Sequence, residues 1–310
     1  MAGEFHPEGL KRHSMRERRS LVNAANFAAL PEAGCSVDEL IESLPDILAG
    51  ANFKVLLRRL REIRDSGGPV VMAIGAHVIK CGLSPVVIDL MRRTIVTTVA
   101  TNGAGAVHDW EIAFAGETSE EVAAELPAGR FGMTKETAAA LAEAAHLAHE
   151  ERAGLGETLG RLINERGLDY REHSILAAAA EYGVPATVHV AVGTDVVHMH
   201  PEADGADIGA ATMADFRKIC MVVSTLSRGA WLNIGSAVIL PEVFLKAVAV
   251  ARNLGCDLDG MVTANFDMFD LYRPRTNVVN RPSSNGFTII GRHEIMLPLL
   301  RMGLISGPGE

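Results

Sequence analysis

The sequence predicts a doubly wound α/β fold, with a mostly parallel sheet and helices on both of its faces. Short, nearly continuous apolar runs recur along the 310 residues, and most of them stop at a glycine. Longer stretches with helical spacing lie between these runs. Ala, Val, Ile, Leu and Gly dominate, whereas aromatic residues make up 5% of the chain, a composition that favours layered α/β packing over a β-sandwich.

Six runs are expected to form the strands. A run that is apolar at every position is typical of a parallel strand covered on both faces, because a half-exposed strand would alternate with polar residues. The runs are residues 70–75, 95–100, 186–193, 230–235, 260–264 and 287–291.

Helices are expected between the strands, at residues 52–65, 83–93, 134–151 and 242–254. The first is amphipathic, and the third is rich in Ala with no strand character. The last stops before Gly255, a typical C-terminal residue after a helix.

The domain organisation follows from these elements. Residues 1–45 are expected to form an N-terminal arm and helix, and residues 46–310 a single domain with a helical insertion at about 117–181. The arm carries a basic stretch at residues 11–19, which is either a solvated segment or an arm reaching onto a neighbouring subunit.

Charge and cysteine content exclude several partners. The formal net charge is −9 and no broad basic face is evident, so no nucleic-acid partner is expected. No apolar run reaches about 18 residues and no secretory signal pattern is present, so no membrane partner is expected. The four cysteines lie far apart and form no CxxC pair, which indicates a reduced, cytoplasmic protein.

Polar and ionisable side chains follow all six predicted strands. The carboxyl ends of parallel strands meet at one edge of a sheet, where ligands bind in open α/β folds. The sequence therefore predicts a ligand site at this edge. The segments concerned are residues 75–80, 101–111, 193–205, 235–242, 265–275 and 292–294.

Histidines supply the candidate acid/base groups. His198 and His200, with Glu202 and Asp204 nearby, suggest a metal site, but their spacing matches no recognisable zinc-enzyme motif, so no metal is predicted. Histidines in such a loop serve equally as hydrogen-bonding or acid/base groups. The candidate catalytic residues are His108, Asp109, His198 and His293.

Two further patterns suggest anion binding. Gly103-x-Gly105 would let the backbone approach a phosphate or ribose, although it is not a full dinucleotide fingerprint and could be a tight turn. Four arginines near two prolines could grip a carboxylate or phosphate, or could be solvent-exposed or contact another subunit. They are Arg273, Arg275, Arg281 and Arg292. The candidate substrate-binding residues are Glu111, His200, Glu242, Asp267, Arg273 and Arg292.

From about Gly50 to Leu300, the order and spacing of short motifs resemble deoxyhypusine synthase. The resembling segments are Gly50–Phe53, Thr101–Asp109, Gly193–Asp195, Ile234–Ala237, Thr263–Ala264 with Phe269–Asp270, and Leu297–Leu300. Deoxyhypusine synthase binds NAD at its strand ends between subunits of a homotetramer. It oxidises spermidine and passes the aminobutyl group through an imine on a lysine.

The resemblance implies NAD as the cofactor, with NADP as the alternative, and a homo-oligomer, either a tetramer or a dimer. It places His108 and Asp109 where the family has a glutamate pair that holds the polyamine. The residues that it places beside the dinucleotide are Thr101, Asn102, Gly103, Asp195, Gly235, Ser236, Thr263 and Ala264.

Three departures argue against authentic deoxyhypusine synthesis. Residues 277–282 replace the family's Trp-Gly-Lys segment, and an arginine there cannot form an imine because it stays protonated. Pro241-Glu242 stands where the family has a histidine, and Arg292 and His293 replace acidic positions.

The expected function is therefore an NAD(P)-dependent enzyme that oxidises a small amine or amino acid to an imine, which water, ammonia or an internal amine attacks. The alternatives are a catalytically altered nucleotide- or metabolite-binding protein, or a metal-dependent enzyme that uses His198 and His200.

Overall fold

The structure, a computed structural model, describes residues 6–306. Six strands form one sheet in the order β3-β2-β1-β4-β5-β6, and every neighbouring pair is parallel. The strands are β1 (Val70–Ile74), β2 (Thr98–Asn102), β3 (Ala186–His189), β4 (Ala230–Ile234), β5 (Val262–Asp267) and β6 (Asn285–Ile290). The predicted fold class is confirmed.

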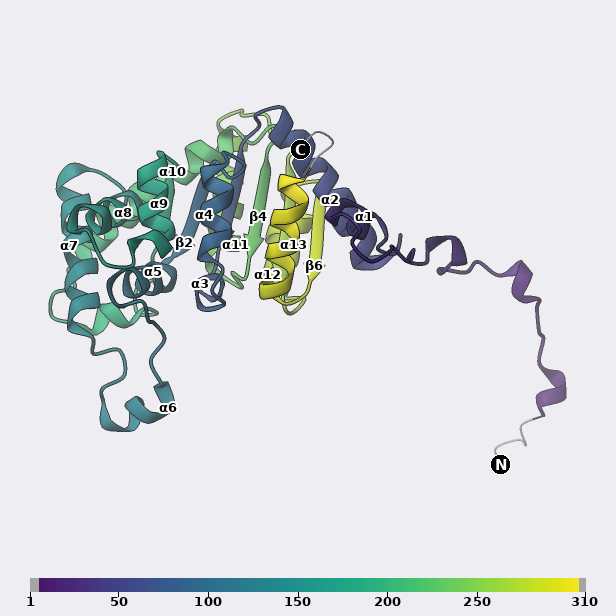
Figure 1. Cartoon of the computed structure of the whole chain (residues 1–310), viewed down its shortest axis with the longest axis horizontal. Helices are drawn as coiled ribbons and strands as arrows, with labels where there is room; N and C mark the ends of the chain where they lie inside the picture. The colour runs from purple at the N-terminus through teal and green to yellow at the C-terminus, as the bar shows by residue number, and fades with distance from the viewer. Residues whose placement is uncertain (1–5, 307–310) are drawn as a thin grey trace.

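The strand order creates a topological switch point between β1 and β4. The chain runs outward from β1 through β2 to β3, returns to β4 beside β1, and then runs outward through β5 to β6. Connections therefore leave β1 and β4 in opposite directions, and in open α/β sheets ligands bind outside the carboxyl ends of the strands at such a point. These ends lie along the lower edge of the sheet in Figure 1, near α3 and α12.

Helices cover both faces of the sheet (Figure 1). They are α1 (Val37–Glu42), α2 (Leu48–Asp65), α3 (His77–Lys80), α4 (Ser84–Arg92), α5 (Gly103–Ala115), α6 (Val122–Glu125), α7 (Lys135–Glu151), α8 (Leu155–Arg166), α9 (Ile175–Tyr182), α10 (Gly205–Ser224), α11 (Ile239–Asn253), α12 (Tyr272–Pro274) and α13 (His293–Ile305). A π-helix, η7, spans Arg275–Asn280. Short 3₁₀ helices are η1 (Pro7–Gly9), η2 (Met15–Glu17), η3 (Ala24–Asn26), η4 (Leu126–Ala128), η5 (Arg171–His173) and η6 (Val196–Met199).

The sheet separates two hydrophobic clusters. The larger one joins strand residues such as Met72 to α2, α4, α5, α7–α9 and α13. The smaller one lies under α10 and α11, where the Trp231 and Phe244 rings stack with centroids 4.3 Å apart. Burial on both faces explains why the strand sequences are apolar at nearly every position.

Strand boundaries differ from prediction at β2, β3 and β5. The predicted run 186–193 is too long, because β3 ends at His189 and the Val190 amide donates to the Thr212 hydroxyl of α10. The predicted run 95–100 begins too early, because the amides of Ile95 and Val96 donate to the Leu90 carbonyl and close the end of α4. β5 extends three residues past the predicted end, through Asp267, because its polar residues remain paired with β6.

The expected helical insertion contains α6–α9, and α7, α8 and α9 pack into the larger cluster. Residues 6–30 of the N-terminal arm run away from the body and are almost entirely exposed (Figure 1). The expected N-terminal arm begins with residues 1–5 and the expected domain ends with residues 307–310, and both of these stretches lie outside the described residues. Within residues 6–306, no helix has both the length and the apolar character needed to cross a membrane.

Candidate functional site

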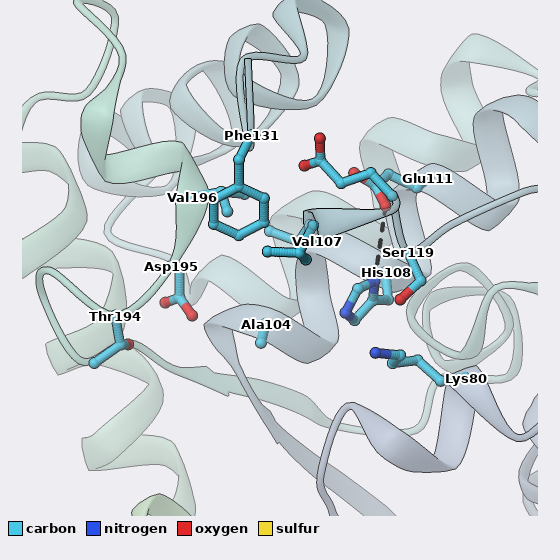
Figure 2. A pocket seen from close by; sticks show the side chains of 12 residues that line it. Lys80, Ala104, Val107, His108, Glu111, Ser119, Phe131, Thr194, Asp195 and Val196 are labelled. Atoms are coloured by element: carbon cyan, nitrogen blue, oxygen red, sulfur yellow. Dashed lines mark ion pairs between the residues drawn. The ribbon is translucent and has the colours of Figure 1, made fainter. Parts of the chain in front are cut away.

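A cavity of about 210 Å³ lies at the carboxyl ends of β1, β2 and β3 (Figure 2). α3 contributes Lys80, α5 contributes His108 and Glu111, and the loop after β3 contributes Asp195. The segment 117–134, which joins α5 to α7, covers the cavity with Ser119, Glu120, Val122 and Phe131. Three of the sequence-predicted residues, His108, Glu111 and Asp195, thus meet in one cavity.

The turn from β2 into α5 fixes where the cavity residues stand. Asn102 caps the helix by accepting a hydrogen bond from the Gly105 amide at 2.9 Å, and the Thr101 hydroxyl donates to the Ile74 carbonyl at 3.0 Å. A Cβ at Gly105 would overlap the Thr101 hydroxyl. Thr101 and Asn102, expected beside the cofactor, both have internal hydrogen bonds: Asn102 starts α5, and Thr101 joins β2 to β1.

Asp195 occupies the N-terminus of α5. A Cβ at Gly103 would overlap its Oδ2, so this glycine makes room for a carboxylate and not for a phosphate. Asp195 is 7% exposed, and its Oδ2 has no hydrogen-bond partner within the described residues. Burial raises the pKa of Asp195, against the opposing effect of the nearby His198. A negative group here complements the helix dipole.

His108 and Glu111 are linked through Thr118. His108 Nδ1 lies 2.6 Å from the Thr118 hydroxyl, which donates to Glu111 Oε2. The dashed line in Figure 2 marks the pair of His108 and Glu111, whose Nδ1 and Oε2 atoms lie 3.7 Å apart. Burial acts to raise the pKa of Glu111, but the neighbouring His108 and the hydrogen bond from Thr118 outweigh it and hold this pKa below its ordinary value.

Asp109 is turned away from the cavity. Its carboxylate accepts hydrogen bonds from Ser174 and from the amides of Ile175 and Leu176, at 2.7 and 3.1 Å, and so caps α9. It is almost fully buried, and burial raises the pKa of Asp109 to about 6. The structure therefore gives this predicted catalytic residue a structural position.

The switch point brings two further histidines together. The His77 and His293 rings meet edge to face with centroids 5.8 Å apart. His293 is 1% exposed, its Nε2–H donates to the Phe266 carbonyl at 3.2 Å, and its Nδ1 has no partner within residues 6–306. A Cβ at Gly75 would overlap the Gly235 carbonyl, so the two strand ends touch through their backbones.

The residues at the switch point fit a dinucleotide phosphate. Gly235 has a φ of +66°, which turns the chain into α11. Within the described chain, the amides of residues 236–239 donate to no acceptor, and free amides at a helix start bind anions. Gly235 and Ser236 thus remain candidates, whereas Thr263 and Ala264 are fully buried in β5 and do not reach the edge.

Comparison with solved structures supports this description of the fold. A conserved protein of Methanococcus maripaludis S2 assigned to the LOR/SDH type has a TM-score of 0.54 and 16% identity, covering 84% of this chain and 70% of that chain. A protein of Entamoeba histolytica assigned as a deoxyhypusine synthase has a TM-score of 0.51 and 11% identity, covering 87% and 93%. This chain has the deoxyhypusine synthase-like fold.

AgrE, solved in a ternary complex with ornithine and NAD+, has a TM-score of 0.53 and 16% identity. The match covers 84% of this chain but only 34% of AgrE, so the chain spans about a third of that protein. At these identities the likeness concerns the deoxyhypusine synthase-like fold alone. No protein-family model matches the chain, and neither does any curated protein.

The remaining predicted residues lie outside the cavity. Glu242 pairs with Lys246 and with Arg273, the latter at 3.2 Å, and accepts a hydrogen bond from Asn277 of η7. Arg292 is exposed and contacts the sulfur of Met268. The carboxylate of Asp267 accepts a hydrogen bond from the Met268 amide at 2.7 Å, which ends β5.

His198 and His200 are not arranged as metal ligands. His198 Nδ1 accepts a hydrogen bond from the Gly193 amide at 3.2 Å, and His200 Nε2–H donates to the Gly132 carbonyl at 2.8 Å. Among residues 6–306, no group of three or more His, Cys, Asp or Glu side chains is arranged so that it could hold a metal ion. The metal-dependent alternative is therefore not supported, and His200 instead holds the segment 117–134 in place.

Sequence reasoning placed the strand-end segment 75–80 at the site but did not select Lys80 or His77 from it, and it missed the contribution of segment 117–134. Lys80 and His77 are three residues apart on α3, the single turn that follows β1. This one segment therefore places a side chain in the cavity and another at the switch point. This spacing could have been read from the sequence. No local pattern indicates that the segment 117–134 folds over the cavity.

Proposed function

We propose that this protein is an NAD(P)-dependent enzyme that oxidises a small amine or amino acid to an imine. The observation that carries the proposal is one cavity, next to the switch point, that holds a hydrogen-bonded histidine, His108, together with a cation, Lys80, and the buried carboxylate of Asp195. Such a set can orient a charged amine and accept its proton.

The charges favour a zwitterionic substrate. Lys80 suits a carboxylate, whereas Asp195 and Glu120 suit an ammonium group. An amino acid presents both groups, and a cavity of about 210 Å³ suits a small metabolite. The complexes of AgrE with ornithine and with L-arginine, in a protein of similar fold, support this substrate class.

In the proposed reaction, His108 takes the proton that the substrate ammonium loses as the carbon–nitrogen double bond forms. Asp195 lies near the nitrogen and stabilises its positive charge, and Phe131 and Val122 exclude water. The backbone amides of residues 236–239 would hold the dinucleotide phosphates. When bound, the dinucleotide supplies the acceptor for the hydride that leaves the substrate carbon. Water, ammonia or an internal amine then attacks the imine.

Calorimetric titration with NAD+ and NADP+ tests the cofactor. Ala237→Asp places a carboxylate among the free amides at the start of α11, and we expect it to weaken dinucleotide binding about tenfold or more. Ala237→Asn is the matched control. A folded protein that binds neither dinucleotide would overturn the proposal.

Turnover is tested with a panel of amines and amino acids by measuring the formation of the reduced dinucleotide. Asp195→Asn is expected to raise KM for cationic substrates. A native mass spectrum would reveal a co-purified dinucleotide and test the proposed dimer or tetramer.

A further inference from the structure

A gap between His108 and Glu111 is filled by a residue from outside their helix. The two side chains lie three residues apart on α5, but His108 Nδ1 is 3.7 Å from the nearer Glu111 oxygen, too far for a hydrogen bond. The Thr118 hydroxyl stands between them, 2.6 Å from Nδ1. The hydrogen-bonded path from His108 to the Glu111 carboxylate therefore passes through Thr118.

The direction of these hydrogen bonds is fixed by chemistry. Glu111 is held as a carboxylate, which only accepts, and its other oxygen accepts from Thr137 at 3.3 Å. The Thr118 hydroxyl must therefore donate to Glu111, which leaves its oxygen to accept from Nδ1–H of His108. A neutral His108 in this tautomer keeps an unprotonated Nε2, the form that a base requires.

We propose that Thr118 is a positioning residue, which holds His108 in the tautomer with Nδ1 protonated and so makes its Nε2 the base of the cavity. The inference rests on the proposed function only for what the base does. The tautomer itself is a property of the protein without ligand.

Thr118 also connects the base to the segment that covers the cavity. α5 ends at Gly116, with a φ of +72°, and Ser119 follows Thr118 with a φ of +75°. The far end of the segment is held at Gly132, whose amide donates to Glu120 at 2.7 Å and whose carbonyl accepts from His200. When the segment 117–134 packs over the cavity, Phe131 completes the cavity wall. The same packing brings Thr118 to His108 and forms the hydrogen bond that fixes the tautomer.

Nitrogen NMR of the histidine rings, in the full chain without ligand, tests the inference. In the wild type we expect His108 to be mainly protonated on Nδ1. Thr118→Val keeps the shape but removes the hydroxyl, and should lower the ratio of this tautomer to the other about tenfold. Thr118→Ser should restore it, and Glu111→Gln should weaken it by removing the charge.

Thr137→Val is the matched control, because it removes a hydroxyl from the same carboxylate without touching His108. We expect it to leave the tautomer unchanged. The remaining charged groups that line the cavity, Lys80, Glu120 and Asp195, are the same in all these variants. An unchanged tautomer in folded Thr118→Val, or equal effects of the two valine variants, would overturn the inference.

With a substrate in hand, Thr118→Val should reduce kcat about 10- to 100-fold and shift its pH profile, with little change in KM, and Thr118→Ser should recover most of the rate. A tautomer that responds as expected in a protein that binds no dinucleotide would overturn the proposed function and leave the role of Thr118 standing. Dinucleotide-dependent turnover, together with a tautomer that does not change in Thr118→Val, would support the proposed function and overturn the role of Thr118.

Discussion

Asp215 offers a quantitative test of the buried electrostatics. Its side chain is fully buried on α10, where Oδ2 accepts hydrogen bonds from the amides of Gly156 and Val188 at 3.0 and 2.9 Å. The carboxylate thereby joins α10 to α8 and β3. Burial raises the pKa of Asp215 from 3.8 to about 7, against the opposing effects of these hydrogen bonds.

The raised pKa makes stability depend on pH. The folded state holds the Asp215 proton more tightly than the unfolded chain, so its contribution to the free energy of unfolding is complete below pH 3.8 and is lost as pH rises through about 7. A difference of about three pH units corresponds to about 4 kcal/mol, at about 1.36 kcal/mol per unit. Asp215→Asn removes the titrating group and should therefore remove this contribution to the pH dependence of the free energy of unfolding.

The assay is urea unfolding of the wild type and of Asp215→Asn at several pH values between about 4 and 8. The difference in unfolding free energy between the two proteins should change by about 4 kcal/mol in favour of the variant as pH rises. Asp169→Asn, at an exposed position, is the control and should run parallel to the wild type. A variant whose profile also runs parallel to the wild type would refute the reasoning.

Three further changes test the site and its supports. Asp109→Ala removes the cap of α9 and should lower the free energy of unfolding by about 2–4 kcal/mol in a denaturant titration; a loss below about 1 kcal/mol would contradict the capping role. Gly103→Ala should push Asp195 aside, lower the free energy of unfolding by about 1–3 kcal/mol and weaken amine binding in calorimetry, whereas unchanged binding would show that Asp195 is not a ligand group. His200→Ala releases the Gly132 carbonyl and should speed amide exchange across residues 117–134, as seen by hydrogen-exchange mass spectrometry; unchanged exchange would mean that other contacts hold the segment.

The fold could be predicted because its main signal is local. Each buried parallel strand is apolar along its length, so the run itself marks the strand. The errors arose where another interaction used the same residues: Ile95 and Val96 are apolar but close the end of α4. The polar residues of β5, such as Asn265, remain in the strand because β6 pairs with them.

The site was predictable only in part, since strand-end position does not fix side-chain direction. His108 and Asp109 are adjacent on a helix, so their side chains point about 100° apart and only one faces the cavity. Thr263 was expected at the edge, but β5 continues past it. Thr118 could not have been found from the sequence, because its role depends on how the segment 117–134 folds back onto α5.

The carboxylate of Asp195 at the start of α5 makes the charge distribution along the sheet edge asymmetric. Three carboxylates, those of Glu111, Glu120 and Asp195, outnumber the one lysine in the cavity at the β2–β3 end of the edge, which is therefore negative. The start of α11 presents positive backbone dipoles at β4, and the Arg292 side chain is exposed farther along the edge. A molecule with a cation at one end and an anion at the other can lie along this edge in only one favourable orientation. For such a molecule, the charge pattern of the protein would favour one direction of binding before any contact with the reacting atoms is made.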